Sequence, residues 1–232
     1  MAIQLYPPLK EVRYGTRKVV VDKWSDYTRY ISQPFGAGAD NPLYTVTLKI
    51  KAHNGIDIPC FDGTPVYATH DGDVLFAGKD TTGSWSVLLW NKENNFRTEY
   101  FHARKNGLVI KTGDQITRGT LMGYWDSTGY STGHHLHFGL KETDKKGKVI
   151  NYYNGYHGAI DPLPFRVDYK KEMELIQKQG ENYLWAIIDE KRYWVANPHS
   201  LDTIKYKVEI GDPYVYPYVS QVAFLNADEP GA

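Results

Sequence analysis

Alternation of apolar and polar side chains predicts short β-strands over most of the chain. Residues 65–69 and 73–77 alternate on either side of an Asp-Gly pair, which favours a tight hairpin turn. Residues 86–90 and 97–102 alternate in the same way around a polar turn and predict a second hairpin. Because turn signals recur every ~8 to 12 residues, the pattern indicates an all-β sandwich or barrel.

The pattern changes near residue 161, where two prolines in Asp161-Pro162-Leu163-Pro164 interrupt regular structure. Residues 169–179 contain helix-forming side chains and predict a short helix. Residues 184–188 and 192–195 alternate around a polar turn and predict a third hairpin. We therefore expect a main domain between an N-terminal extension that packs on its core and a small α+β C-terminal module, with boundaries at 1–31, 32–166 and 167–232.

Composition narrows the classes of function and of metal site. The 232 residues include 27 Lys and Arg and 27 Asp and Glu, so the formal net charge of zero makes nucleic acid an unexpected partner. Apolar runs such as residues 87–90 are far below the ~18 residues of a membrane span, and residues 1–8 lack the features of a secretory signal. The single cysteine, Cys60, excludes an intrachain disulfide, so any metal site must use histidines and carboxylates.

Histidines gather in one short segment. Three of the eight histidines lie within residues 133–139. In a strand, alternate side chains share a face, so His135 and His137 would face one way while Leu136 and Phe138 face the core. The two imidazoles could serve one metal site as ligand and neighbouring acid or base, or both as ligands.

A second motif places a histidine and a carboxylate four residues apart, at His53 and Asp57. Together with one histidine of the distant pair, they would supply three nitrogen and oxygen ligands and leave zinc one open position. Such a site is typical of hydrolytic zinc enzymes, because bound zinc lowers the pKa of water to ~7.

Taken together, these motifs resemble the lysostaphin/LytM-type zinc endopeptidases, which cut the peptide cross-links of peptidoglycan. The resemblance covers about residues 32 to 166, and the motifs follow the family's order. They are the segments 32–36, 53–57, 63–68, 100–102, 113–123, 128–138 and 161–164.

The resemblance implies a compact antiparallel β-sandwich with an open groove. It implies one Zn²⁺ held by His53, Asp57 and His137, with His102 and His135 as the catalytic general base and the stabiliser of the oxyanion. The implied substrates are peptidoglycan peptides in the cell wall, outside the cytoplasm. Without a visible signal peptide, the chain would be a signal-trimmed secreted protein or a phage-encoded virion or lysis protein.

Three features depart from the family pattern. His134 stands where the family usually has proline, and Gly139 where glutamate is common. Residues 37–52 form a longer segment that would be one wall of the groove.

We interpret His70, His157 and His199 as solvated or structural.

The main alternative is a virion- or wall-associated structural or binding protein on the same scaffold. In that case the C-terminal module would be the functional part and would dock to a virion or wall partner through Tyr214, Tyr216 and Tyr218. A ligand-poor homologue would lack a metal ligand, and none is missing. A sugar-phosphotransfer carrier domain is disfavoured by the His53 and Asp57 pair.

Overall fold

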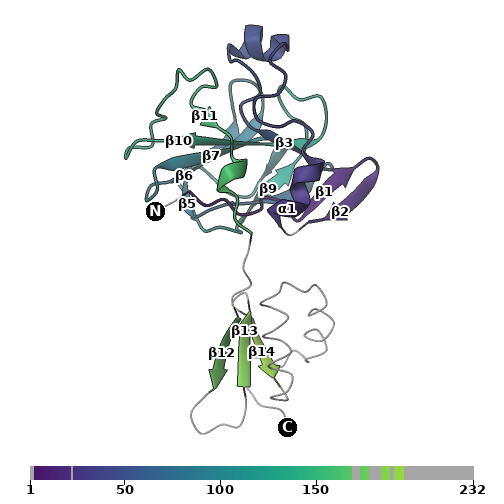
Figure 1. The fold of residues 1–232 in the computed structure, drawn as a ribbon, viewed down its shortest axis with the longest axis vertical. Coiled ribbons are helices and arrows are strands. Elements are labelled where there is room, and N and C mark those ends of the chain that lie inside the picture. Colours follow the sequence, from purple (N-terminus) through teal and green to yellow (C-terminus); the bar gives the residue numbers. More distant parts are fainter. Residues whose placement is uncertain (1–2, 22, 169–172, 178–183, 189–190, 196–232) are drawn as a thin grey trace. The chain divides into compact units, whose positions relative to one another are not determined.

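We describe the protein from a computed structural model. The structure describes residues 3–21, 23–168, 173–177, 184–188 and 191–195. The chain divides into two compact units, Met1–Tyr169 and Lys170–Ala232 (Figure 1). Each unit is described by itself.

The first unit is built on a nine-stranded antiparallel sheet, which confirms the prediction of an all-β main domain. The strands run in the order β11-β10-β7-β6-β5-β8, with β3 paired to β10, and with β4 paired to β9, which itself pairs with β7. Their bounds are β3 Ile56–Pro59, β4 Thr64–Tyr67, β5 Gly72–Lys79, β6 Trp85–Asn91, β7 Phe96–Leu108, β8 Gln115–Ile116, β9 Leu121–Trp125, β10 His135–Glu142 and β11 Ala159–Ile160.

Strand β7 joins the two parts of this sheet. Its first half pairs with β6 and β10, and its second half pairs with β9. Between the halves, His102 has φ of 74°, a left-handed conformation that is uncommon for a residue other than glycine. The backbone N–H of His102 donates to Ser84 Oγ at 2.9 Å. Strand β7 therefore changes its pairing partners at His102.

The core lies between the two parts of the sheet. The rings of Tyr100 and Phe138 are 5.2 Å apart, and Tyr100 also meets Trp125 edge to face. All three side chains are buried. Leu136 and Phe138 point into this core, as their alternation with the histidines predicted.

The N-terminal segment packs on the same core. It contains the hairpin β1 Glu11–Tyr14 and β2 Arg17–Val20, the short helix α1 Trp24–Tyr27 and the 3-10 turn η1 Thr28–Tyr30. Trp24 is buried against Phe138, with ring centroids 6.0 Å apart, and its Nε1–H donates to the Leu5 carbonyl at 2.7 Å. The hairpin lies against β3 (Figure 1).

Two other short helical elements complete the unit, the π-helix η2 Leu43–Leu48 and the 3-10 turn η3 Leu163–Phe165. The π-helix lies inside the long segment that the sequence singled out at residues 37–52. Among the residues described, no helix is long and apolar enough to span a membrane.

One predicted hairpin is right and another is wrong. Strands β6 and β7 form the hairpin expected around the polar turn before residue 96. The hairpin expected over residues 65–77 does not form, because β4 pairs with β9 while β5 pairs with β6 and β8. The residues between β4 and β5 instead contact distant segments of the chain. His70 Nε2 is hydrogen-bonded to Thr98 Oγ1 at 2.8 Å, and the Asp71 carboxylate accepts the Arg118 backbone N–H at 2.7 Å.

The second unit contains a three-stranded antiparallel sheet of β12 Met173–Gln177, β13 Leu184–Ile188 and β14 Lys191–Val195. Strands β13 and β14 form the third hairpin, as predicted. The helix predicted for residues 169–179 is wrong over its described part, which is strand β12. A two-stranded hairpin is marginal alone, so pairing with a third strand outweighs weak helix propensity. Tyr214, Tyr216 and Tyr218 lie outside the described residues.

The left-handed backbone at residue 102 predicts an inverted order of stability for two substitutions there. Replacing His102 with glycine should leave the protein about 1 kcal/mol more stable than replacing it with alanine, because only glycine adopts positive φ without steric cost. Chemical denaturation of both variants measures the difference. In an ordinary strand alanine is the more stable residue, and that order here would contradict the conformation described.

Candidate metal centre and its neighbours

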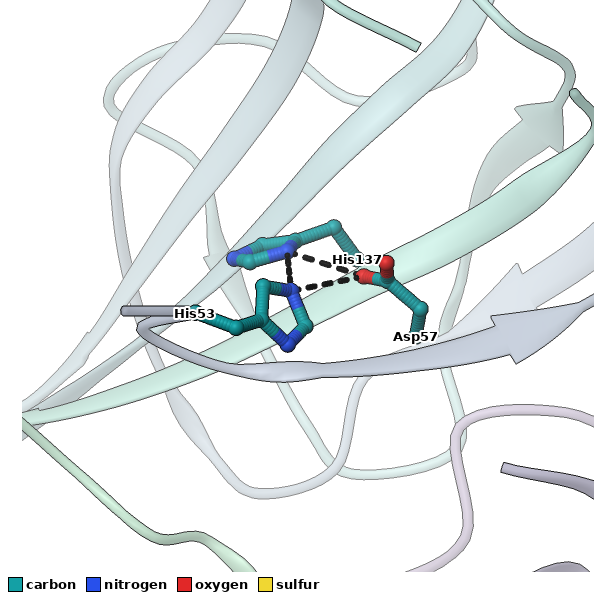
Figure 2. A group of neighbouring side chains, drawn as sticks. All are labelled: His53, Asp57 and His137. Atoms are coloured by element: carbon teal, nitrogen blue, oxygen red, sulfur yellow. Dashed lines mark hydrogen bonds and ion pairs between the residues drawn. The ribbon is translucent and has the colours of Figure 1, made fainter. Parts of the chain in front are cut away.

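Two paired strands and one loop bring His53, Asp57 and His137 together. His137 on β10 lies directly opposite Asp57 on β3, and side chains opposite each other in an antiparallel pair share a face. His53 enters from the loop that precedes β3, four residues before Asp57. Figure 2 shows the three side chains pointing toward one point.

The donor atoms of these three residues converge within hydrogen-bond distance. His53 Nε2 lies 2.9 Å from His137 Nδ1 and 3.1 Å from Asp57 Oδ1, and His137 Nδ1 lies 3.0 Å from the same oxygen. All three residues are nine-tenths buried or more. The structure therefore contains a compact group of two nitrogens and one oxygen.

Electrostatics favour an ionised carboxylate at this position. Burial raises the pKa of Asp57, but the close contacts of its carboxylate with the imidazoles of His137 and His53 outweigh burial and hold the pKa below its usual range. Burial lowers the pKa of His137 against the opposing effect of Asp57, which favours the neutral imidazole. An anionic carboxylate and neutral imidazoles are the forms that bind a metal.

The hydrogen bonds of His53 fit a metal ligand. Its Nδ1–H donates to the Pro34 carbonyl at 3.1 Å, so Nε2 carries a lone pair that faces the lone pairs of the group. A cation at their meeting point removes this conflict, and a backbone acceptor behind a ligating imidazole is the usual arrangement. Two imidazoles and one carboxylate are a set that holds Zn²⁺ with one position open, so the group fits one zinc ion.

Gly55 makes the close approach of these residues feasible. A Cβ atom at this position would lie 2.7 Å from His137 Nε2 and 2.6 Å from the Phe138 carbonyl oxygen. Both distances are shorter than real Cβ contacts. The glycine between His53 and Asp57 is therefore needed for packing against β10.

His102 and His135 lie beside the three-residue group. Their rings are 4.6 Å apart, and His135 Nε2 lies 3.6 Å from Asp57 Oδ2. The Nδ1–H of His102 donates to the Thr128 carbonyl, and that of His135 donates to the Gly133 carbonyl, each at 2.7 Å. In both rings Nε2 is then the atom left for proton exchange.

A single loop thus orients both rings. Thr128 Oγ1 accepts the Trp85 backbone N–H at 2.9 Å and donates to the Ala103 carbonyl at 2.7 Å, which fixes the loop to β6 and β7. Gly129 follows with φ of 75°, and a Cβ there would lie 2.7 Å from the Ser84 backbone nitrogen. Burial, and next the positive field of His135, lower the pKa of His102 to about 4.

The structure brings together all five residues singled out from the sequence, and the other described histidines lie outside the group. His70 is buried and hydrogen-bonded to Thr98, and burial lowers its pKa to about 4. His134 pairs with Asp126 at 2.7 Å, and His157 stacks on a tyrosine ring. His199 lies outside the described residues.

Sequence reasoning missed one neighbour of the group. Tyr44 on η2 is buried, and its ring centroid lies 5.7 Å from that of His53. Burial raises the pKa of Tyr44, and the negative charge of Asp57 adds to this effect. The only feature of the sequence that pointed to Tyr44 was its position in the long segment at residues 37–52, which precedes His53.

Comparisons with known proteins agree with this chemistry. Residues 51–152 match the model described as peptidase family M23. Peptidoglycan DD-endopeptidase ShyA of Vibrio cholerae is 31% identical over 139 residues, which cover 60% of this chain and 30% of that protein. Glycyl-glycine endopeptidase ALE-1 of Staphylococcus capitis is 34% identical over 114 residues, covering 49% and 28%. The chain spans less than a third of the length of these relatives.

Among solved structures, the catalytic domain of lysostaphin from Staphylococcus simulans aligns over 59% of this chain and 88% of that chain. Its TM-score is 0.43, with 28% sequence identity. All five site residues fall within residues 51–152, the segment that matches the model of peptidase family M23.

Proposed function

We propose that this domain is a zinc-dependent endopeptidase that hydrolyses peptide bonds in bacterial peptidoglycan. The observation that carries the proposal is the convergence of His53, Asp57 and His137 beside two further imidazoles. A scaffold that only bound the wall would not require five such groups in one place. In this proposal the three residues are the zinc ligands, and His102 and His135 are the catalytic residues.

The substrate class rests on the relatives. Two of them carry names that describe peptide-bond cleavage, a peptidoglycan DD-endopeptidase and a glycyl-glycine endopeptidase. We infer that this chain also acts on peptide parts of peptidoglycan, and that it works on the cell wall outside the cytoplasm.

Zinc at this centre would lower the pKa of a water to ~7 and polarise the carbonyl of the peptide bond. His102 is neutral at pH 7, because its pKa is lowered to about 4, so its Nε2 can take a proton from the attacking water. His135 Nε2 lies 3.6 Å from Asp57 Oδ2, and when the ring carries a proton on both nitrogens this atom can donate to the oxygen on which negative charge develops. The proton held by His102 then passes to the leaving amine.

Metal content should separate the ligands from the catalytic histidines. The purified protein should bind about one zinc per chain and lose wall-lytic activity with a chelator. His137→Ala should be metal-poor and inactive. His102→Ala and His135→Ala should retain zinc while the rate falls by ~10² to 10⁴. Elemental analysis and peptidoglycan hydrolysis on the same preparations measure both quantities.

His157→Gln serves as the matched control, because His157 lies outside the group, and it should retain both zinc and activity. A metal-poor His135→Ala beside a metal-replete His137→Ala would reverse the assignment of ligand and catalytic residue. Full lysis by metal-free protein would reject the zinc mechanism.

Two glycines of the loop at 127–133 should respond differently to the same substitution. Gly129→Ala should lower the turnover rate roughly 10- to 100-fold at unchanged zinc content, because the added Cβ meets Ser84 and shifts the carbonyl that orients His102. Gly133→Ala should be close to wild type, since nothing lies within 4 Å of its Cβ position. Kinetics on a soluble peptide, with zinc content and melting temperature, test the pair. Equal activity of the two variants would contradict the positioning role of the loop.

A further inference from the structure

A concave site lies at the end of β3, the strand that carries Asp57. It is a cavity of about 480 Å³ between the tip of the β1–β2 hairpin and the η1 segment. Its walls include the side chains of Arg13 and Tyr14 from the hairpin, Arg29 and Tyr30 from η1, and Pro59 at the end of β3. Nothing in the proposed reaction uses these residues.

Strand pairing places this cavity in line with the metal centre. Asp57 and Pro59 are two apart on β3, so they face the same side of the sheet, and the step between them is ~6.6 Å along the strand. Pro59 lies opposite His135 in the same way that Asp57 lies opposite His137. A chain held over the centre and running along β3 therefore reaches the cavity within about two residues.

The charge of the cavity is positive. Arg13 and Arg29 are the basic residues among those that line it, and no acidic residue lines it. Within the described part of the chain, neither guanidinium has a carboxylate at ion-pair distance. The neighbouring acid Glu11 is already paired with Lys18 at 2.8 Å.

The side chains that line the cavity have a geometry that favours binding of a planar anion. A guanidinium presents its donors in a planar fork that matches the two oxygens of a carboxylate. Arg29 lies over the Tyr30 ring, 4.9 Å from its centroid, which restricts its position. Tyr14 is 64% exposed and offers an aromatic flank to the rest of a bound residue.

We propose that this cavity binds a carboxylate of the substrate peptide through Arg13 and Arg29, and that it selects peptides with an acidic group within about two residues of the bond that is cut. The inference rests on the proposed endopeptidase function and adds a specificity determinant to it. The carboxylate could be the free end of a peptide or an acidic side chain, and both have the same recognition chemistry.

The experiment uses soluble cross-linked peptide fragments of peptidoglycan in two forms. One form is native, and in the other the free carboxylates are converted to methylamides with carbodiimide and methylamine. The full-length zinc-loaded protein should cleave native fragments about tenfold faster, in kcat/KM, than amidated ones. The R13Q/R29Q double variant should lose this preference through slower cleavage of the native form, at unchanged zinc content.

Lys146→Gln is the matched control, because it removes one positive charge in the turn that follows β10, and it should keep the preference. Synthetic peptides with only a terminal or only a side-chain carboxylate distinguish the two sources. Equal cleavage of native and amidated fragments by the wild type, or a preference that survives in R13Q/R29Q, would overturn the carboxylate site and leave the endopeptidase function intact. No cleavage of either form would overturn the endopeptidase function and, with it, this inference.

Discussion

The pairing of β10 with β3 is the constraint on which the rest of the site depends. It sets His137 opposite Asp57 on one face, and the backbone of residues 53–57 then has to fold back tightly enough to add His53. Burying a carboxylate is costly unless it is paired and hydrogen-bonded. Here the two imidazoles supply that pairing, and a cation between the three donors would supply more. A shift of one residue in this register would turn either His137 or Asp57 into the core.

The second half of the site depends on the path of β7. That strand changes partner at His102, where the left-handed backbone turns the imidazole toward His135. The loop at 127–133 accepts a hydrogen bond from each ring, so one segment fixes the tautomer of both. Strand β10 thus contributes His137 to the three-residue group and His135 to the pair of imidazoles beside it.

Much of this site could be predicted from sequence, because its determinants are local. The alternation at residues 135–138 predicted which side chains face the core, and the motif at 53–57 named the other two donors. The prediction of a hairpin over residues 65–77 failed for a nonlocal reason. The Asp71 carboxylate accepts a hydrogen bond from the Arg118 backbone, and His70 is hydrogen-bonded to Thr98. The predicted helix failed over residues 173–177, the part that the structure describes, because strand pairing with β13 outweighed a weak propensity. The cavity near Arg13 was also out of reach, because it brings together three separate segments.

The central claim is that two imidazoles and one carboxylate hold a single zinc ion. X-ray absorption at the zinc edge of the purified protein tests it most directly, because imidazole rings give a characteristic multiple-scattering signal. The account predicts two imidazole ligands and oxygen ligands at ~2.0 to 2.2 Å. A signal from three or more imidazoles, or from a single one, would contradict the assignment of His53, Asp57 and His137.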